Sequence, residues 1–540
     1  MASGRREFLA VVGSLAGGLV AGSATGDSRG SAVAAGQADG YAPLGSVDIA
    51  GARDTAVAGE VAYVATGDGF VTVDVSGENP SVLAERRGIP TSDSGQLTGI
   101  WDLWPSGDRL AVGGPAQFRR NQQSGVGLFD VSDPTDPEQV AFHPTDHHIH
   151  NLHFGDNVLY LPARDRPMSL VMVDVSGDDP VEVGRWSPFD ADDRWADIEP
   201  PLRVLHDVFV RDGTAYLPYW DAGTWLVDVS DPTDPTAYSR VGDYSVEQVA
   251  AVGPGQAGLV AQTPDGADHY AQVDETGSVL AVGKETWAIE DRRGTFGETG
   301  RRVGGASGIT LYNVSDPTSP EELSSIDPPV SVDQRTSGWF TTAHDFDFRD
   351  GRLFTSWYYG GVAVYDVSDP ADPTEVSRWQ DPRTASFWTA RAVDDERFVA
   401  SSVDVSSVLG GRAETREGLY VFPNEAGSQA DPPLLTDWPE DVFGPEPDDR
   451  PPVNRTAASV DRLVDVRDPD DERGDRHDGP DSPGERSGDR NGTDGTPAMP
   501  REGSTNGSGP GLGVGTALAG VGGYLLARRA GLLSDSDGDG

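Results

Sequence analysis

Short apolar runs rich in β-branched residues recur along the chain, and each ends in a similar polar phrase. Runs such as Gly69–Val75 and Gly361–Val367 have the length and composition of buried strands. Serine, aspartate and often proline follow each run, which favours a tight turn. A further short strand comes next, as at Gln139–Phe142 and Val376–Trp379. The pattern therefore predicts repeated strand–turn–strand units.

The polar phrase occurs six times. The copies are Val73-Asp74-Val75-Ser76-Gly77, Phe129-Asp130-Val131-Ser132-Asp133-Pro134, Val173-Asp174-Val175-Ser176-Gly177, Val227-Asp228-Val229-Ser230-Asp231-Pro232, Tyr312-Asn313-Val314-Ser315-Asp316-Pro317 and Tyr365-Asp366-Val367-Ser368-Asp369-Pro370. Most copies are 44–56 residues apart and one gap is 85. This spacing is typical of a four-stranded propeller blade with its loops.

A second motif precedes each phrase and defines seven units. It begins with a strand-start residue and leads to an aromatic or aliphatic residue about ten positions later, as in His150-Asn151-Leu152 to Tyr160. The seven strand-start residues are Arg53, Trp101, His150, His206, His269, His344 and Trp388. Because inner strands surround a propeller axis, we expect these residues to form one ring, called the hub below.

The last unit ends at Leu419-Tyr420-Val421-Phe422 without an outer strand, and Pro43–Ile49 resembles an outer strand without a unit. Closing the ring with this N-terminal strand leaves no unpaired edge. The sequence therefore predicts an all-β, seven-bladed propeller over residues 41–425. The phrases resemble the LVIVD repeat family, whose members are propeller-like surface proteins. That resemblance implies a fold and no particular reaction.

Charge and composition narrow the functions that such a fold could have. Acidic residues outnumber basic ones by 88 to 41, which gives a net charge of −47, and Lys284 is the only lysine. An acidic folded surface suits high salt, where ions screen self-repulsion. It does not suit nucleic acid, which needs a basic face. The absence of cysteine excludes disulfides and thiolate metal sites.

The two ends of the chain indicate export and anchorage at a cell surface. Residues 1–26 resemble a twin-arginine signal, with Arg5-Arg6 before a weakly apolar stretch. Residues 426–508 are predicted to be a disordered acidic stalk with glycosylation candidates at Asn454, Asn491 and Asn506. Residues 509–533 resemble the PGF-type sorting signal of haloarchaeal surface proteins, although Leu512 stands where that family has phenylalanine. The resemblance implies membrane or lipid anchorage, with cell-envelope components or an unknown ligand as partner.

Histidine is concentrated at the hub. Four consecutive hub positions carry it, although the whole chain has nine. Since imidazole is a common metal ligand, His150, His206, His269 and His344 are predicted to hold Cu or Zn, with His147 and His148 as further candidates. The alternative is that these histidines only pack between blades. The residues that follow, Asp102, Asn151, Asp207 and Asp345, would then join blades, whereas in a metal site they would orient the imidazoles.

Two functions of different class remain open at this point. The first is a surface binding or scaffold module, which the absence of known catalytic motifs favours. The second is an extracytoplasmic, copper-type oxidoreductase, because selenium-binding proteins and methanethiol oxidases resemble this chain in placing histidines near a propeller hub. In both cases Arg53, Trp101 and Trp388 are expected to line the rest of the channel.

Overall fold

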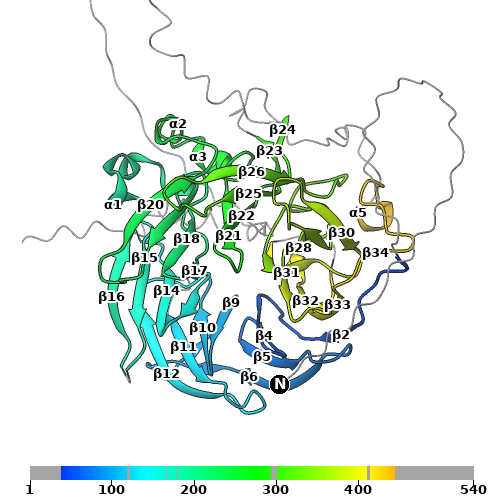
Figure 1. The fold of residues 1–540 in the computed structure, drawn as a ribbon, viewed down its shortest axis with the longest axis horizontal. Coiled ribbons are helices and arrows are strands. Elements are labelled where there is room, and N and C mark those ends of the chain that lie inside the picture. Colours follow the sequence, from blue (N-terminus) through cyan, green and yellow to red (C-terminus); the bar gives the residue numbers. More distant parts are fainter. Residues whose placement is uncertain are drawn as a thin grey trace, which may run out of the picture. The chain divides into compact units, whose positions relative to one another are not determined.

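The computed structural model describes residues 38–443, apart from 118–121, 166, 178, 293–300 and 410–413. Seven sheets follow one another around a common axis, each with four antiparallel strands, and two short parallel strands extend one of them to six (Figure 1). The helices among the described residues are short, and none is long and apolar enough to cross a bilayer. The prediction of an all-β, seven-bladed propeller is confirmed.

Blades 1 to 4 are each formed by four strands in sequence order. Blade 1 contains β3 (Thr55–Ala58), β4 (Val61–Ala65), β5 (Gly69–Asp74) and β6 (Ser81–Arg87). Blade 2 contains β9 (Asp102–Ser106), β10 (Arg109–Gly114), β11 (Ser124–Asp130) and β12 (Glu138–Thr145). Blade 3 contains β13 (His153–Gly155), β14 (Val158–Pro162), β15 (Leu170–Asp174) and β16 (Val181–Trp186). Blade 4 contains β17 (Phe209–Arg211), β18 (Thr214–Pro218), β19 (Thr224–Asp228) and β20 (Thr236–Val241).

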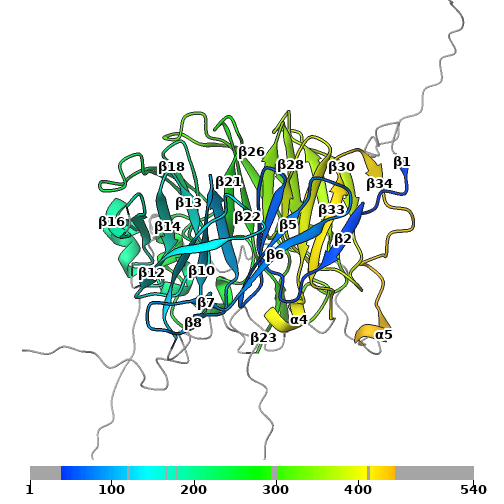
Figure 2. The ribbon, with the colours of Figure 1, turned by 90° about the horizontal axis from the view of Figure 1, so that it is seen from below.

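The later blades carry insertions or additions. Blade 5 contains β21 (Asp268–Val273), β22 (Val279–Lys284), β25 (Ile309–Asn313) and β26 (Glu321–Ile326). A separate hairpin, β23 (Ala288–Asp291) with β24 (Arg301–Gly304), interrupts this blade and extends from one end of it (Figure 2). Helices α2 (Val246–Ala250) and α3 (Ala257–Val260) precede the blade. These two insertions account for the 85-residue gap in the repeat.

The N-terminal strand closes the ring, as predicted. Blade 7 is formed by β31 (Phe387–Ala392), β32 (Arg397–Ser402), β33 (Gly418–Pro423) and β2 (Gly45–Asp48). The antiparallel pairing of β2 with β33 runs from Gly45 opposite Val421 to Asp48 opposite Gly418. The outer strand of the last blade therefore comes from the start of the described chain, which leaves β33 without a free edge.

The folded unit continues past the predicted boundary at residue 425. Blade 6 contains β27 (Phe346–Arg349), β28 (Arg352–Ser356), β29 (Val362–Asp366) and β30 (Thr374–Trp379). Two short parallel strands, β34 (Gly427–Ser428) and β1 (Ala38–Asp39), extend its outer edge. Leu435 is buried near Trp339, and α5 (Glu440–Phe443) follows it. Residues 426–443 therefore belong with the propeller and not with the predicted stalk.

The remaining short elements lie in connections between or within blades. They are the hairpin β7 (Ile89–Pro90) with β8 (Gln96–Leu97), helix α1 (Pro188–Ala191), the 3₁₀ turns η1 (Asp193–Asp197) and η2 (Pro200–Leu202), and helix α4 (Val405–Val408). In the side view, β7, β8, β23 and α4 lie toward the same end of the propeller (Figure 2).

The repeated phrase forms the turn between the third and fourth strands of blades 1 to 6, which we call the rim turns. In each turn an Asp or Asn side chain accepts the backbone N–H of the serine two residues later, at 2.7–3.1 Å. This hydrogen bond replaces the one that the chain loses on leaving the sheet. Turn chemistry therefore accounts for the acidic residues of the phrase.

Candidate metal centre

Six of the seven predicted hub residues form a closed ring of side-chain contacts. Ring centroids are 5.3 Å apart between Trp101 and His150, 4.7 Å between His150 and His206, and 3.8 Å between His206 and His269. The circle continues at 4.7 Å from His269 to His344, 4.2 Å from His344 to Trp388, and 6.0 Å from Trp388 to Trp101. The four histidines thus occupy one arc and the two tryptophans the other.

Arg53, the seventh hub residue, turns away from this circle. Its guanidinium contacts the Glu417 carboxylate at 3.1 Å, the Ser407 hydroxyl at 3.3 Å and the Ala52 carbonyl. Arg53 was expected to line the channel. It instead contacts the loop before β33, because the Glu417 carboxylate there pairs with its charge.

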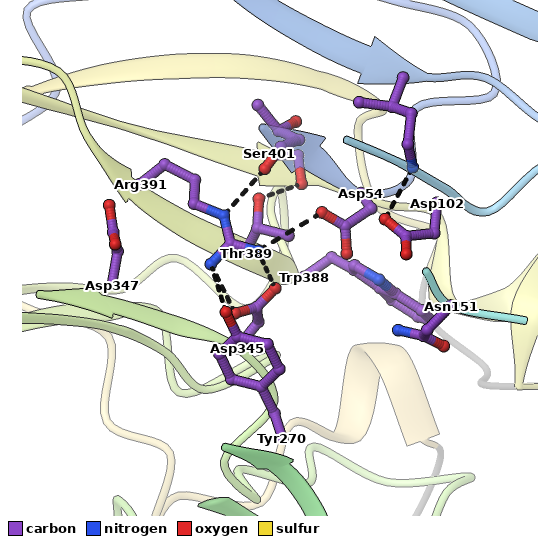
Figure 3. A network of polar contacts seen from close by, with 12 residues as sticks. Asp54, Asp102, Asn151, Tyr270, Asp345, Asp347, Trp388, Thr389, Arg391 and Ser401 are labelled. Carbon is purple, nitrogen blue, oxygen red and sulfur yellow. Dashed lines mark hydrogen bonds and ion pairs between the residues drawn. The ribbon is translucent and has the colours of Figure 1, made fainter. Parts of the chain in front are cut away.

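One residue further along each inner strand, polar side chains join neighbouring blades (Figure 3). The Asp102 carboxylate accepts the Leu152 N–H at 2.6 Å, so blade 2 is bound to blade 3. The Asn151 amide donates to Asp207 at 2.5 Å, which joins blade 3 to blade 4. These hydrogen bonds go to backbone and to one another. Through these two contacts Asp102, Asn151 and Asp207 join blades, which is the role that the packing alternative assigned to them.

Arg391, on the inner strand of blade 7, brings a cation into this layer (Figure 3). Its guanidinium contacts both oxygens of Asp345, at 2.6 and 2.8 Å, and lies 3.7 Å from Asp54. Burial raises the pKa of Asp345 to about 6, and Arg391 opposes that rise. Burial also raises the pKa values of Asp54 and Asp102 well above the usual range, and neighbouring carboxylates add to the effect.

Aromatic side chains fill the axis below the polar layer. Trp104 lies 4.7 Å from His153 and 6.2 Å from Phe209, measured between ring centroids. Arg391 lies over the Trp104 ring at 5.7 Å. Since these side chains are packed against one another, the hub and the opposite end of the axis are separated by a filled core.

Two buried histidines and one partly exposed carboxylate meet with the geometry of a metal site: His206, His269 and Glu285. Within the described part of the chain they form the one group of three such side chains whose ligand atoms all lie within 4.8 Å of one another. His269 Nε2 is 3.2 Å from the Glu285 carboxylate. The Nδ1 atoms of His206 and His269 are buried and find no partner among the described residues. A transition metal that accepts N and O ligands fits this donor set.

The neighbouring imidazoles are oriented by the backbone. His344 Nδ1 lies 2.7 Å from the Trp388 carbonyl oxygen, and His150 Nδ1 lies 3.1 Å from that of Ala116. A carbonyl can only accept, so each Nδ1 carries the proton and each Nε2 keeps its lone pair. This is the arrangement found around metal-ligating histidines. His344 is therefore the candidate fourth ligand.

The electrostatics of the site favour the neutral form of His344 and His206 and the ionised form of Glu285. Burial lowers the pKa of His344 to about 3, and the nearby His269 contributes to the shift. Burial also lowers the pKa of His206. Burial alone would raise the pKa of Glu285, but His269, His344 and the Tyr358 hydroxyl lower it to about 2. Neutral imidazole and ionised carboxylate are the forms that bind a cation.

His147 and His148 lie outside this group. His147 Nδ1 contacts Asp146 at 2.8 Å, on the connection between blades 2 and 3. Burial lowers the pKa of His148 to about 3, and the charges of Arg164 and His147 lower it further. The structure therefore brings the four hub histidines together and leaves the two additional candidates at the edge.

Glu285 escaped the sequence reasoning, although a signal was present. It stands two positions after Gly283, which pairs with Ile309. Trp220 and Tyr358 occupy the same place in blades 4 and 6, where Trp220 stacks on His206 and Tyr358 contacts His344. The aromatic stretches Tyr219-Trp220 and Trp357-Tyr358-Tyr359 match in the sequence, but the β23–β24 insertion hides the corresponding position of blade 5.

The glycosylation candidates Asn454, Asn491 and Asn506 lie outside the described residues, as do the segments 1–26 and 509–533 and most of the predicted stalk. Their expected roles stay predictions.

Comparison with known proteins agrees with the repeat and the fold. Residues 50–88, 205–243 and 359–381 match the family described as LVIVD repeat. The chain carries LVIVD repeats. The matched stretches include the rim turns of blades 1, 4 and 6 and cover part of the chain, so they establish the repeat and not a shared activity. No curated protein has a significant sequence match to the chain.

Solved structures of similar fold have low sequence identity. The Cps50 (Swd1) β-propeller domain of Myceliophteria thermophila is 11% identical with a TM-score of 0.46, over 71% of this chain and 99% of that one. The structure titled U3-55K is 10% identical with a TM-score of 0.44, over 67% and 92%. The designed Ika8 protein is 10% identical with a TM-score of 0.39, over 68% and 85%.

Proposed function

We propose that this chain is an exported, surface-anchored propeller whose hub binds one transition metal ion, zinc or copper. The observation that carries the proposal is the group of His206, His269 and Glu285, with ligand atoms within 4.8 Å of one another. His344 is an additional candidate ligand beside this group, because its protonated Nδ1 leaves Nε2 available. The metal would be held at the wall of the ring where histidines meet.

Burial of unpaired polar atoms supports the metal over simple packing. A buried imidazole nitrogen without a partner costs free energy, and His206 and His269 each have one. Glu285 is a largely buried anion beside His269, and a cation would offset its desolvation. Packing between blades would be achieved at lower cost by the aromatic residues that occupy this place in blades 4 and 6.

Metal content of the full-length chain tests the proposal. The protein is folded in high salt, equilibrated with zinc or copper and analysed by mass spectrometry after removal of free metal. We expect one ion per chain, lost in His206→Ala and reduced in Glu285→Gln. His147→Ala is the matched control and keeps its metal, since His147 pairs with Asp146 outside the group. If the chain holds no stoichiometric metal, or if all variants hold equal amounts, the metal site is wrong. The remaining proposal is then a binding or scaffold module without a metal.

A copper-type oxidoreductase is the second candidate. Two imidazoles and one carboxylate leave coordination positions open, which a reaction at the metal requires. The Tyr358 hydroxyl also donates a hydrogen bond to Glu285. Electron paramagnetic resonance of the copper-loaded chain tests this candidate. A Cu(II) signal that a reductant abolishes and oxygen restores supports it, whereas a signal that never cycles indicates a structural ion.

Export and anchorage form the cellular part of the proposal, and they rest on the sequence of the two ends. Arg5-Arg6 and the apolar stretch after them support export of a folded protein. That order would let the hub acquire its metal before export. Fractionation of cells expressing Arg5→Lys with Arg6→Lys tests it. We expect the variant to stay inside the cell, and an unchanged surface location would exclude twin-arginine export.

A further inference from the structure

A second ring of side chains lies beside the hub on its histidine arc. It is made of the residues two positions after the last residue of each second strand that pairs with the third strand. The strand pairings that fix this place are Pro162 with Leu170, Pro218 with Thr224, Gly283 with Ile309 and Ser356 with Val362. In blades 3 to 6 the place is held by Arg164, Trp220, Glu285 and Tyr358.

Three of these four residues contact the hub histidine of their own blade. Trp220 stacks on His206 at 6.3 Å between ring centroids. Tyr358 lies 5.0 Å from His344. Glu285 is 3.2 Å from His269. The same register therefore places Arg164 beside the fourth histidine, His150.

The electrostatics agree with this placement. After burial, the charge of Arg164 is the largest influence that lowers the pKa of His150. It also lowers the pKa of His206. The guanidinium is thus near enough to both imidazoles for its charge to be felt across the arc.

Arg164 differs from the other arginines around the axis in having no carboxylate. Arg391 contacts Asp345 at 2.6 Å, and Arg53 contacts Glu417 at 3.1 Å. The guanidinium of Arg164 makes no ion pair or hydrogen bond with any described residue, and burial alone lowers its pKa to about 10. In a chain with 88 acidic and 41 basic residues, a half-buried arginine without a carboxylate partner is unusual.

We propose that Arg164 binds a small anion with two oxygens, a carboxylate or an inorganic oxyanion, that also coordinates the hub metal. This inference rests on the metal proposed above. A guanidinium presents paired N–H donors to such an anion, and the open coordination positions accept its other oxygen. Trp101 and Trp388 lie on the opposite arc, 6.0 Å apart, so a carboxylate with a flat apolar body gains further contact there.

Anion titrations of the full-length chain loaded with Co(II) test the inference. Acetate, benzoate and phosphate are added separately at constant ionic strength while the visible Co(II) bands are recorded. We expect a saturable shift of these bands. Preference for benzoate identifies an organic carboxylate, and preference for phosphate identifies an oxyanion. Arg164→Gln should weaken the anion by about tenfold or more, because a charge-assisted hydrogen bond is lost.

Two controls separate this inference from the proposed metal site. Arg164→Gln should take up Co(II) with the same bands as the native chain when no anion is added, which shows that its hub is intact. Arg53→Gln should bind each anion like the native chain, since Arg53 is already paired with Glu417. Native chain that binds Co(II) but no anion, or Arg164→Gln that binds anions normally, overturns the inference alone. Native chain that takes up no Co(II) overturns the metal site as well.

Discussion

The rim turns and the hub positions each recur once per blade, but the rim turns keep the same residue types whereas the hub positions do not. In each of the six rim turns a serine N–H donates the same hydrogen bond to an Asp or Asn side chain. At the hub one backbone position carries histidine, tryptophan or arginine according to the blade. A rim turn is satisfied within its own blade, whereas hub side chains contact those of other blades. The residues that the blades share at the rim turns therefore stabilise the fold. The residues that differ between blades at the hub supply the candidate metal ligands.

The largest expected effect is on stability and comes from the layer below the hub. Arg391→Met leaves the buried carboxylate of Asp345 without its cation, so we expect a loss of about 3–5 kcal/mol in the free energy of unfolding. Arg86→Met removes an exposed pair with Asp136 near the rim and should cost about 1 kcal/mol or less. Denaturant unfolding measures both. Equal losses in the free energy of unfolding would contradict a larger contribution from the ion pair at the axis than from the one near the rim.

The next effect is on metal affinity. His269→Ala should weaken zinc binding by at least about a hundredfold, since even residues that only orient a ligand contribute about ten- to a hundredfold. In the double variant His269→Ala, Glu285→Gln, the fold-loss of zinc affinity should be smaller than the product of the two single fold-losses, because both residues bind the same ion. Competition with a chelator of known affinity measures this. Independent losses would contradict a shared site.

A buried carboxylate outside the hub should respond to pH in the opposite way from a rim turn. Both oxygens of Asp221 are buried without a partner among the described residues, and burial raises its pKa well above the usual range. The folded state then holds this proton over a pH range where the unfolded chain has released it. Stability therefore falls as pH rises from the unfolded pKa, near 4, through the folded pKa.

Asp221→Asn removes this titration, so we expect a gain of about 1 kcal/mol at pH 7 that shrinks toward pH 4. Thermal unfolding across that range checks the sign. A gain that does not depend on pH would show that charge burial is not its cause.

The smallest effects are expected at the rim. Asp228→Ala and Asp366→Ala each remove the hydrogen bonds to a serine two residues later, which should cost about 0.5–1 kcal/mol. The Ser230 hydroxyl and N–H lower the pKa of Asp228, so its contribution is present at neutral pH and is lost as pH falls through the folded pKa. The double variant should lose the sum within about 0.5 kcal/mol. Strong coupling would mean that rim turns are not local.

Much of the fold follows from the sequence because rim turns and strands depend on nearby residues. The phrase at Asp228 and its copies predict the blades, and the unpaired β2 segment predicts closure. The order of the hub ring also follows, since equivalent positions surround one axis. Arg53 could not be placed in this way, because its partner Glu417 is 364 residues away in sequence. Arg391 and Glu285 could not be predicted for a related reason. Each stands at a position that recurs in every blade, but the other blades carry a different residue type there.

X-ray absorption at the zinc edge tests the central claim most directly. The full-length chain is loaded with one equivalent of zinc, and the nearest scatterers are assigned. We expect at least two imidazole nitrogens, from His206 and His269, with a carboxylate oxygen from Glu285, at about 2.0–2.2 Å. Imidazole scattering should disappear in the His206→Ala, His269→Ala double variant. A native spectrum with oxygen neighbours alone would contradict a metal at the hub.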